Sequence, residues 1–295
     1  MKIIFNADDF GISEENTQNI SDCFDYGLDS CSVIVNNNYV TREIIRNKIF
    51  SKNKKTNLHL NLIEGTAITQ SKENYEKNFI TNKHNTFDNS FIKLIFIYYF
   101  SLGDKKKLVK KQIKEEIENQ IKKYIYITNK YDFISIDSHQ HVHLIPFIFD
   151  IILDLSKKYK IKYIRTTKEI LLIDELLISF FSNLSNIIKL YALNYFSYLA
   201  KKKLHKFEIK TCKYFFGVMF TGKITSDKIK KYLKKLKNDK DTLEILLHPG
   251  FINKKENNDF FKNSKFKNYY SSIDRKIEKK NFTSGKIQLI KNTYV

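Results

Sequence analysis

Short apolar runs alternate along the chain with longer segments in which apolar residues recur every three or four positions. The short runs predict strands over 2–6, 31–35, 58–62, 133–137, 162–166, 214–220, 243–247 and 285–290. The longer segments predict helices over 13–26, 39–50, 90–101, 105–129, 146–159 and 226–237, and two apolar helices between 170 and 200. Ser13 is a suitable N-cap for the first helix, and Ile113, Ile117 and Ile121 share one face of the fourth.

This alternation predicts parallel strands joined by helical crossovers. We expect an α/β fold, a single distorted (β/α) barrel of the TIM type, with residues 1–295 forming one catalytic domain; an open doubly wound sheet is the second choice. No Gly-x-Gly-x-x-Gly turn follows the first strand, which argues against a dinucleotide-binding version. Residues 64–89 are polar and predict a variable lid loop, whereas residues 168–204 predict an apolar helical insertion.

The charge of the chain invites a nucleic-acid interpretation. Its 295 residues include 52 Lys and Arg against 32 acidic residues, a formal net charge of +20. However, Arg, the residue suited to bidentate phosphate and base contacts, occurs only at Arg42, Arg46, Arg165 and Arg275. The excess is Lys, together with many Asn, Ile, Tyr and Phe residues, a bias typical of AT-rich coding. We therefore expect solvated lysines and no specific nucleic-acid partner.

Cysteine content and apolar patterning bound the compartment. Three cysteines, none in a Cys-x-x-Cys pair, exclude a disulfide scaffold and a zinc ribbon. The first apolar run is too short for a signal peptide, so we expect a cytoplasmic protein. Charged residues interrupt the apolar stretch 170–200, so it falls short of the roughly 18 apolar residues of a membrane span. Peripheral membrane contact stays open because Lys201, Lys202 and Lys203 follow, and the apolar helices make a homodimer plausible.

Ionisable side chains collect at the ends of four predicted strands. These segments are 6–11 (NADDFG), 57–62 (NLHLNL), 137–143 (DSHQHVH) and 247–250 (LHPG), and three of them hold five of the seven histidines. The carboxyl ends of parallel strands meet on one face of an α/β fold, where active sites lie. We therefore expect these four segments to converge on one site.

The residue types suit a mononuclear metal hydrolase. Three imidazole or carboxylate ligands leave one position for a water, whose pKa the metal lowers. Asp8 and Asp9 can both face one cleft at a strand-to-loop turn, so that one binds metal and the other accepts a proton. His139, His141 and His143 would share a face if the segment is extended, which would let two of them bind one ion.

Structural roles compete with these assignments. A pair of aspartates after a strand is often a turn or a helix cap, and His59 could be a hydrogen-bonded core histidine. Three imidazoles at one strand end are harder to explain as packing, because burying polar groups without partners is costly.

Together, these motifs resemble those of the YdjC-type carbohydrate deacetylases, the family of chitooligosaccharide deacetylase. The resemblance rests on 3–11 (IIFNADDFG), 59–65 (HLNLIEG), 136–146 (IDSHQHVHLIP) and 244–250 (EILLHPG), with weaker similarity at 216–217 and 221–225. They occur in the family order and span residues 1 to about 250. The resemblance implies a distorted barrel and a hydrolase of amide bonds that removes the acetyl group from an N-acetylated amino sugar or short oligosaccharide.

The resemblance also implies roles for individual residues. Metal ligands would fall on Asp9, His59 and His139, with Asp8 as the general base and His248 as the acid that protonates the leaving nitrogen. The remaining residues, Asp137, His141, His143 and Arg165, would line the site or orient the ligands, and Arg165 could hold a substrate hydroxyl or carboxylate.

Several alternatives remain open at this point. The one divalent ion would be Zn²⁺ by ligand type or Mg²⁺ by family resemblance. Which of the neighbouring aspartates and histidines takes which part is not decided by their order. A metal-dependent phosphoesterase or other hydrolase on the same barrel is the alternative function, although a two-metal phosphoesterase usually needs more carboxylates. A non-catalytic module for polyanions would rest on charge alone.

Overall fold

A computed structural model describes residues 1–69, 78–172, 180–236, 241–253 and 264–294. Seven parallel strands form one sheet in the order β5-β4-β3-β2-β1-β7-β6. The strands are β1 (Lys2–Phe10), β2 (Ser30–Val33), β3 (Lys55–Leu60), β4 (Ile134–Ser138), β5 (Ile161–Ile164), β6 (Tyr214–Phe216) and β7 (Thr242–Leu247). The α/β fold and the parallel crossovers are therefore confirmed.

The sheet is curled into a half-barrel, and a full TIM barrel is not seen in the described residues. The long strand β1 lies between β2 and β7, while β5 and β6 form the two edges. Short segments outside the strands bond to both edges. At β5, Ile164 N–H donates to Lys210 O at 3.0 Å and Lys210 N–H donates to Lys162 O at 2.9 Å; at β6, Phe215 N–H donates to Lys168 O at 2.8 Å. The curl brings the carboxyl ends of β1, β3, β4 and β7 toward one another, which positions the site.

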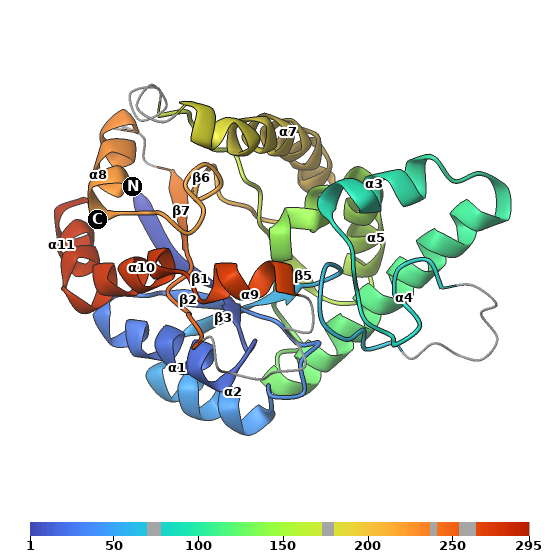
Figure 1. The fold of residues 1–295 in the computed structure, drawn as a ribbon, viewed down its shortest axis with the longest axis horizontal. Coiled ribbons are helices and arrows are strands. Elements are labelled where there is room, and N and C mark those ends of the chain that lie inside the picture. The colour runs from blue at the N-terminus through green and yellow to red at the C-terminus, as the bar shows by residue number, and fades with distance from the viewer. Residues whose placement is uncertain (70–77, 173–179, 237–240, 254–263, 295) are drawn as a thin grey trace.

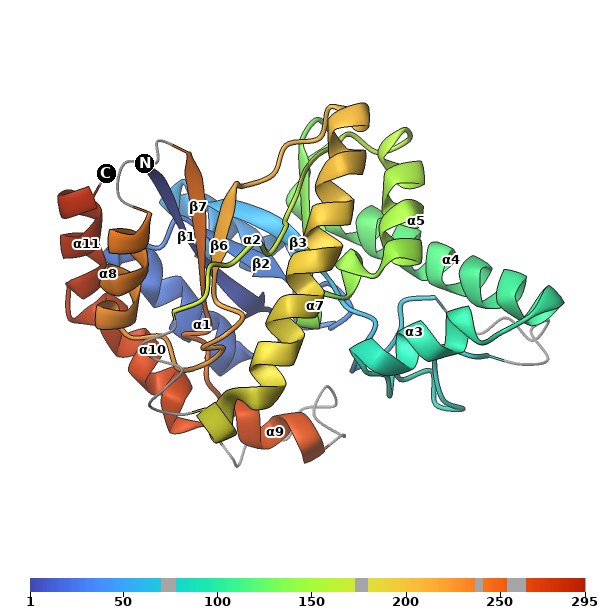
Figure 2. The same cartoon turned by 90° about the horizontal axis from the view of Figure 1, so that it is seen from above.

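Helices cover the outside of the sheet (Figures 1 and 2). They are α1 (Glu14–Cys23), α2 (Arg42–Lys48), α3 (Phe91–Tyr99), α4 (Gly103–Thr128), α5 (Pro146–Ser156), α7 (Phe180–Leu204), α8 (Ser226–Lys235), α9 (Ser264–Tyr270), α10 (Ile273–Thr283) and α11 (Lys286–Tyr294). The Ser13 side chain accepts a hydrogen bond from Asn16 N–H at 3.2 Å, so the expected N-cap is confirmed. Ile113, Ile117 and Ile121 are fully buried on α4, as their spacing predicts.

The prediction of a strand over 285–290 was wrong. This segment lies in α11, which begins at Lys286. Ile287 and Ile290 are both buried, and their three-residue separation places them on the same face of a helix. Packing of that face outweighs the strand preference of a short apolar run. Of the two apolar helices expected over 170–200, the second is α7, and the first falls largely on residues 173–179, outside the described residues.

The loop predicted as a lid over 64–89 lies mostly against α4. Thr66 and Thr86 form an antiparallel bridge. The backbone N–H groups of Ile68 and Thr69 donate to the Glu116 carboxylate at 3.1 and 2.8 Å. No described residue of 65–89 lines the cavity at the carboxyl ends of the strands. Residues 70–77 lie outside the described part of the chain. The lid role and the single-domain organisation stay predictions.

We predict that Gly11→Ala destabilises the fold far more than Gly285→Ala. Both glycines have a left-handed backbone, with φ of +99° and +73°, which strains any L side chain. A Cβ on Gly11 would lie 2.2 Å from Val40 Cγ2, whereas nothing lies within 4 Å of a Cβ on Gly285. We expect losses in unfolding free energy of about 3 and about 1 kcal/mol, measured by urea denaturation. Equal losses would show that the contact with Val40 does not constrain this turn.

Candidate metal centre

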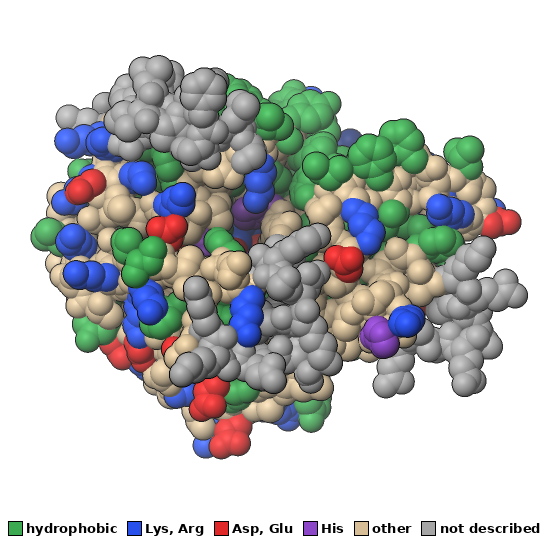
Figure 3. Space-filling model, in the orientation of Figure 1, with side chains coloured by type: hydrophobic (Ala, Val, Ile, Leu, Met, Phe, Trp, Pro, Cys, Tyr) green, Lys and Arg blue, Asp and Glu red, His purple; other side chains and the backbone are tan. Residues whose placement is uncertain are grey.

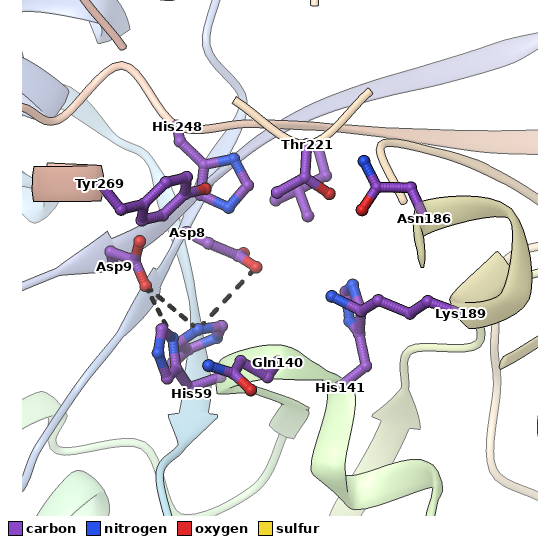
Figure 4. Close-up of a pocket in the computed structure, with 12 residues that line it drawn as sticks. Asp8, Asp9, His59, Gln140, His141, Asn186, Lys189, Thr221, His248 and Tyr269 are labelled. Carbon is purple, nitrogen blue, oxygen red and sulfur yellow. Dashed lines mark hydrogen bonds and ion pairs between the residues drawn. The ribbon is translucent and has the colours of Figure 1, made fainter. Parts of the chain in front are cut away.

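The four polar strand ends meet around one cavity of about 440 Å³ (Figure 4). Its lining residues are Asp8, Asp9, His59, His139, Gln140, His141, Asn186, Lys189, Thr221, Leu246, His248 and Tyr269. They come from the carboxyl ends of β1, β3 and β7, the turns after β4 and β6, and the helices α7 and α9. The expectation that segments distant in sequence converge here agrees with this geometry.

Asp9, His59 and His139 form a compact group of side chains in the cavity. Asp9 Oδ1 lies 3.5 Å from His59 Nε2 and 3.2 Å from His139 Nδ1 (Figure 4). All three residues are buried, and one ligand atom from each lies within 4.8 Å of the others. Two imidazole nitrogens and one carboxylate are a donor set that divalent metals take in hydrolases.

The backbone at the end of β1 turns both aspartates toward this cavity. In a regular strand, Asp8 and Asp9 would point to opposite faces. Asp9 instead has φ of 70°, a left-handed conformation, and the pairing register with β2 shifts between Ala7 and Phe10. Aspartate tolerates this conformation better than most residues, and strained backbone is typical of functional sites.

Each candidate histidine ligand is oriented through its second ring nitrogen. His59 Nδ1 lies 2.5 Å from Asp137 Oδ1, and His139 Nε2 lies 3.0 Å from Glu64 Oε1. The Tyr270 hydroxyl donates to the same Glu64 oxygen at 2.5 Å. These contacts leave His59 Nε2 and His139 Nδ1 facing Asp9. Carboxylates behind imidazoles are the usual arrangement around metal-binding histidines, so these residues fit a metal ion.

Arg165 holds the acidic side chains behind the cavity. Its guanidinium donates to both oxygens of Asp8 at 2.9 Å, and Nη2 lies 2.9 Å from Asp137 Oδ2. Its Nε donates to Glu244 Oε1 at 2.7 Å. The side chain is fully buried and does not line the cavity. The expected contact between Arg165 and a substrate hydroxyl or carboxylate is therefore corrected: the guanidinium is occupied by three carboxylates and positions Asp8.

The three histidines that alternate after β4 do not share a face. Residues 139–144 form a 3₁₀ turn in which Gln140 and His141 have φ of 53° and 59°. The extended segment that would let two of these imidazoles bind one ion is therefore absent from this turn. His143 is fully buried: Ser138 Oγ lies 2.6 Å from its Nδ1, and its Nε2 donates to Arg165 O at 2.9 Å. His141 lines the cavity beside Lys189 (Figure 4). Of the three, His139 is the one in contact with Asp9, with Nδ1 3.2 Å from Asp9 Oδ1.

Buried charges shift the pKa values of these groups. Burial alone lowers the pKa of His59, but Asp8 and Asp137 outweigh it and raise the pKa to about 10. For His139, burial is likewise outweighed by Asp9 and Glu64, which raise the pKa to about 9. Burial raises the pKa of Asp9, yet Arg275 and the histidines hold it well below its ordinary value. The pKa of Asp8 is raised, because burial exceeds the opposing effect of Arg165.

His248 enters the cavity from the end of β7 in a different electrostatic setting. Its Nδ1 lies 3.9 Å from Glu278 Oε2, and its backbone N–H donates to the same oxygen at 2.5 Å. Burial, followed by the positive charge of Arg275, lowers the pKa of His248 to about 3. Its imidazole is therefore neutral at pH 7.

Sequence reasoning missed Arg275, the residue that neutralises Asp9. Arg275 comes from α10 and is fully buried; its Nη2 donates to Asp9 Oδ2 at 2.6 Å, and its Nη1 donates to Gly250 O at 2.7 Å. Tyr269 and Tyr270 flank the guanidinium, with ring centroids 4.3 and 4.5 Å from Cζ. One signal was available, because only four arginines occur in this Lys-rich chain, and two of them are buried here.

Other site residues were also missed as individuals. Glu64 and Glu244 lay inside the recognised motifs without an assigned role, and Asn186, Lys189, Thr221 and Tyr269 line the cavity. Spacing along the chain has no signal for residues of this kind, since α7 and α9 reach the cavity only through the tertiary fold.

The fold and the site together define an α/β protein with a candidate metal centre at the carboxyl ends of parallel strands. The family model described as YdjC-like protein matches residues 2–290. The chain therefore belongs to the YdjC-like family, and the resemblance seen in the motifs is confirmed.

Individual relatives of low sequence identity support the same family assignment. The chain is 25% identical over 170 residues to a carbohydrate deacetylase of Danio rerio, covering 57% of this chain and 50% of the relative. It is 26% identical over 165 residues to a carbohydrate deacetylase of Clostridium beijerinckii, covering 55% and 58%. The matches thus span about half the length of these relatives.

A solved structure shares the fold. It comes from Enterococcus faecalis V583 and is described as a candidate cellobiose-phosphate cleavage protein. The two chains superpose with a TM-score of 0.68 at 18% identity, over 99% of this chain and 94% of the other. At this identity, the similarity concerns the fold alone.

We predict that metal affinity rises with pH between 7 and about 9. In the metal-free chain, His59 and His139 hold their protons at pH 7, since their pKa values of about 10 and about 9 lie above it. A nitrogen must lose its proton to bind a metal, so affinity should rise about tenfold per pH unit for each proton released. Calorimetric titration with Zn²⁺ in buffers of different ionisation enthalpy measures the metal affinity and the number of protons released on binding. A pH-independent affinity without proton release would contradict this assignment.

Proposed function

We propose that this chain is a metal-dependent carbohydrate deacetylase that hydrolyses the acetamide of an N-acetylated amino sugar or short oligosaccharide. The observation that carries the proposal is the buried group Asp9, His59 and His139, with Asp8 beside it at the edge of an open cavity. Membership in the YdjC-like family and the names of the relatives support the substrate class.

Asp9, His59 and His139 would hold one divalent ion, Zn²⁺ or Mg²⁺. Bound there, the ion would act as a Lewis acid toward the acetamide carbonyl and make an adjacent water more acidic. Asp137 and Glu64 keep the two imidazoles oriented, and Arg275 keeps Asp9 ionised so that it can serve as a ligand.

Asp8 would act as the general base. Its carboxylate lines the cavity, and Oδ2 lies 3.9 Å from His59 Nε2, so it borders the ligand group without completing it. The two hydrogen bonds from Arg165 fix its orientation, while burial raises its pKa and makes it a better proton acceptor. Asp8 would take the proton of the attacking water.

His248 would supply the proton that the leaving nitrogen needs. Its imidazole is neutral in the free protein, because burial and Arg275 lower its pKa to about 3. Negative charge developing on the acetamide oxygen would raise that pKa, so His248 would take a proton from solvent and pass it to the nitrogen as the C–N bond breaks, while Asp8 would return the proton of the attacking water to solvent. His141 and Lys189, on the opposite wall, would contact the sugar (Figure 4).

The reaction is tested by acetate release from N-acetylglucosamine and its β-1,4-linked oligomers. We expect release that stops after chelation and returns with added metal, because the cavity residues alone provide no Lewis acid. His139→Ala should abolish both metal retention and activity, since it removes one of three ligands. His84→Ala is the matched control, because His84 is exposed and lies outside the cavity. Failure to release acetate from any acetylated sugar with metal present would reject the proposal.

Replacing the proposed base should separate binding from turnover. Asp8→Asn should retain one metal ion per chain but lower kcat by about 10²- to 10⁴-fold, the usual contribution of a general base. Asp132→Asn, at an exposed aspartate paired with Lys160, should leave kcat unchanged. Metal content is measured by mass spectrometry and kcat by acetate release. Wild-type turnover in Asp8→Asn would assign the base to another residue.

The number of metal ions per chain also distinguishes the deacetylase from the alternative, a phosphoesterase. Asp8, His59 and Asp137 form a second group within 4.8 Å, which overlaps the first at His59. However, both of these carboxylates are held by Arg165, whose positive charge opposes a second cation at that place. One ion per chain would support the deacetylase, and two would favour the phosphoesterase.

A further inference from the structure

Two neighbouring helices expose a set of large apolar side chains, here called the α3/α7 surface. Its members are Ile92, Phe96, Tyr99, Phe100 and Leu102 on and just after α3, with Ile188, Tyr191, Tyr195 and Tyr198 on α7. Their exposed fractions run from 44% to 81%. Single exposed apolar residues are normal, but a contiguous set of this size marks an interaction surface.

The set is organised by helical spacing. Tyr191, Tyr195 and Tyr198 follow one another at four and three residues along α7, so they share one face. The stacked rings of Phe91 and Phe196, with centroids 6.0 Å apart, join α3 to α7. Figure 3 shows hydrophobic side chains gathered along the edge formed by these helices, and Figure 2 shows the helices on the same side of the molecule.

The two helices of the α3/α7 surface carry basic but no acidic side chains, although Asp104 and Asp150 lie beside them, and Asp150 pairs with Lys203. Neither 91–99 nor 180–204 contains Asp or Glu in the sequence, whereas Lys93 and 201–203 are basic. Lysines also lie against the exposed aromatics: Lys106 Nζ is 5.9 Å from the Tyr99 ring centroid, and Lys202 Nζ is 4.3 Å from that of Tyr198. Aromatic and aliphatic side chains interleaved with lysines are typical of helices that lie in a membrane interface.

This charge pattern discriminates between two occupants of the surface. A two-fold dimer would place the same patch against itself, which would bring lysines near lysines without acidic partners on either helix. Anionic lipid headgroups would attract the same lysines while the apolar side chains entered the boundary with the acyl chains. None of the helices in the described ranges is long and apolar enough to cross a bilayer, so the contact would lie along the membrane surface.

The surface adjoins the candidate metal centre through α7. Asn186 and Lys189 on this helix line the cavity, while Ile188 and Tyr191 on its other side are exposed. A bilayer seated on the α3/α7 surface would therefore lie one helix away from the cavity. We propose that this surface binds an anionic lipid bilayer, which would place the site beside glycans held at a membrane.

The test is co-sedimentation with vesicles of phosphatidylcholine, alone and with phosphatidylglycerol added. We expect the full chain to bind the anionic vesicles, and the double variant Phe96→Ser/Tyr195→Ser to bind at least about tenfold more weakly, because two apolar anchors are lost. The matched control is Phe133→Ser/Tyr131→Ser. Its side chains are 52% and 57% exposed, against 53% and 60% for Phe96 and Tyr195, but they lie outside the surface.

The outcomes separate the alternatives. Absent binding by the full chain, or equal weakening in both double variants, would overturn the proposal. Light scattering that shows a dimer separated by Phe96→Ser/Tyr195→Ser, without vesicle binding, would make the surface a subunit interface and also overturn it. If that variant fails to fold in a thermal melt, Lys106→Gln/Lys202→Gln replaces it and should weaken binding to the anionic vesicles. Because the assay needs no catalysis, its result is independent of the proposed deacetylase function.

Discussion

The candidate site depends on two buried arginines that neutralise a concentration of carboxylates. Arg165 binds Asp8, Asp137 and Glu244, and Arg275 binds Asp9. Without these cations, several acidic groups this close together in a buried place could not all stay ionised. With them, Asp137 remains an acceptor for His59, and Asp9 remains available as a ligand. The arginines thus favour the ionised forms of Asp8, Asp9 and Asp137 without lining the cavity.

Local backbone geometry then decides which side chains reach the cavity. Asp9 adopts a left-handed conformation at the end of β1, which turns two adjacent aspartates to the same side. Gln140 and His141 also adopt a left-handed conformation, in the turn after β4. This conformation separates three histidines that a regular strand would align on one face. Such strained residues persist where surrounding contacts hold them, and both turns are anchored by buried hydrogen bonds to other strands and helices.

The helix α7 connects the site with the outer surface. One face contributes Asn186 and Lys189 to the cavity, and another exposes the tyrosines beside α3. Part of the +20 charge comes from lysines that lie against the aromatic side chains of these helices. The helix α7 would then both form part of the cavity wall and hold the cavity near the membrane from which substrate approaches.

The sequence by itself determined the parallel α/β architecture, the Ser13 cap, the buried face of α4 and the convergence of four polar strand ends. These follow from periodicity and from the rule that parallel strands end on one face, both of which are local or topological properties. The choice of Asp9, His59 and His139 as ligands came from the family resemblance of the motifs, because spacing alone left their neighbours equally eligible. Only the tertiary structure decided that 285–290 is helical, that His143 and Arg165 are buried supports, and that Glu64 and Arg275 complete the site. Those outcomes depend on partners up to 266 residues away, and no spacing rule along a chain encodes such contacts.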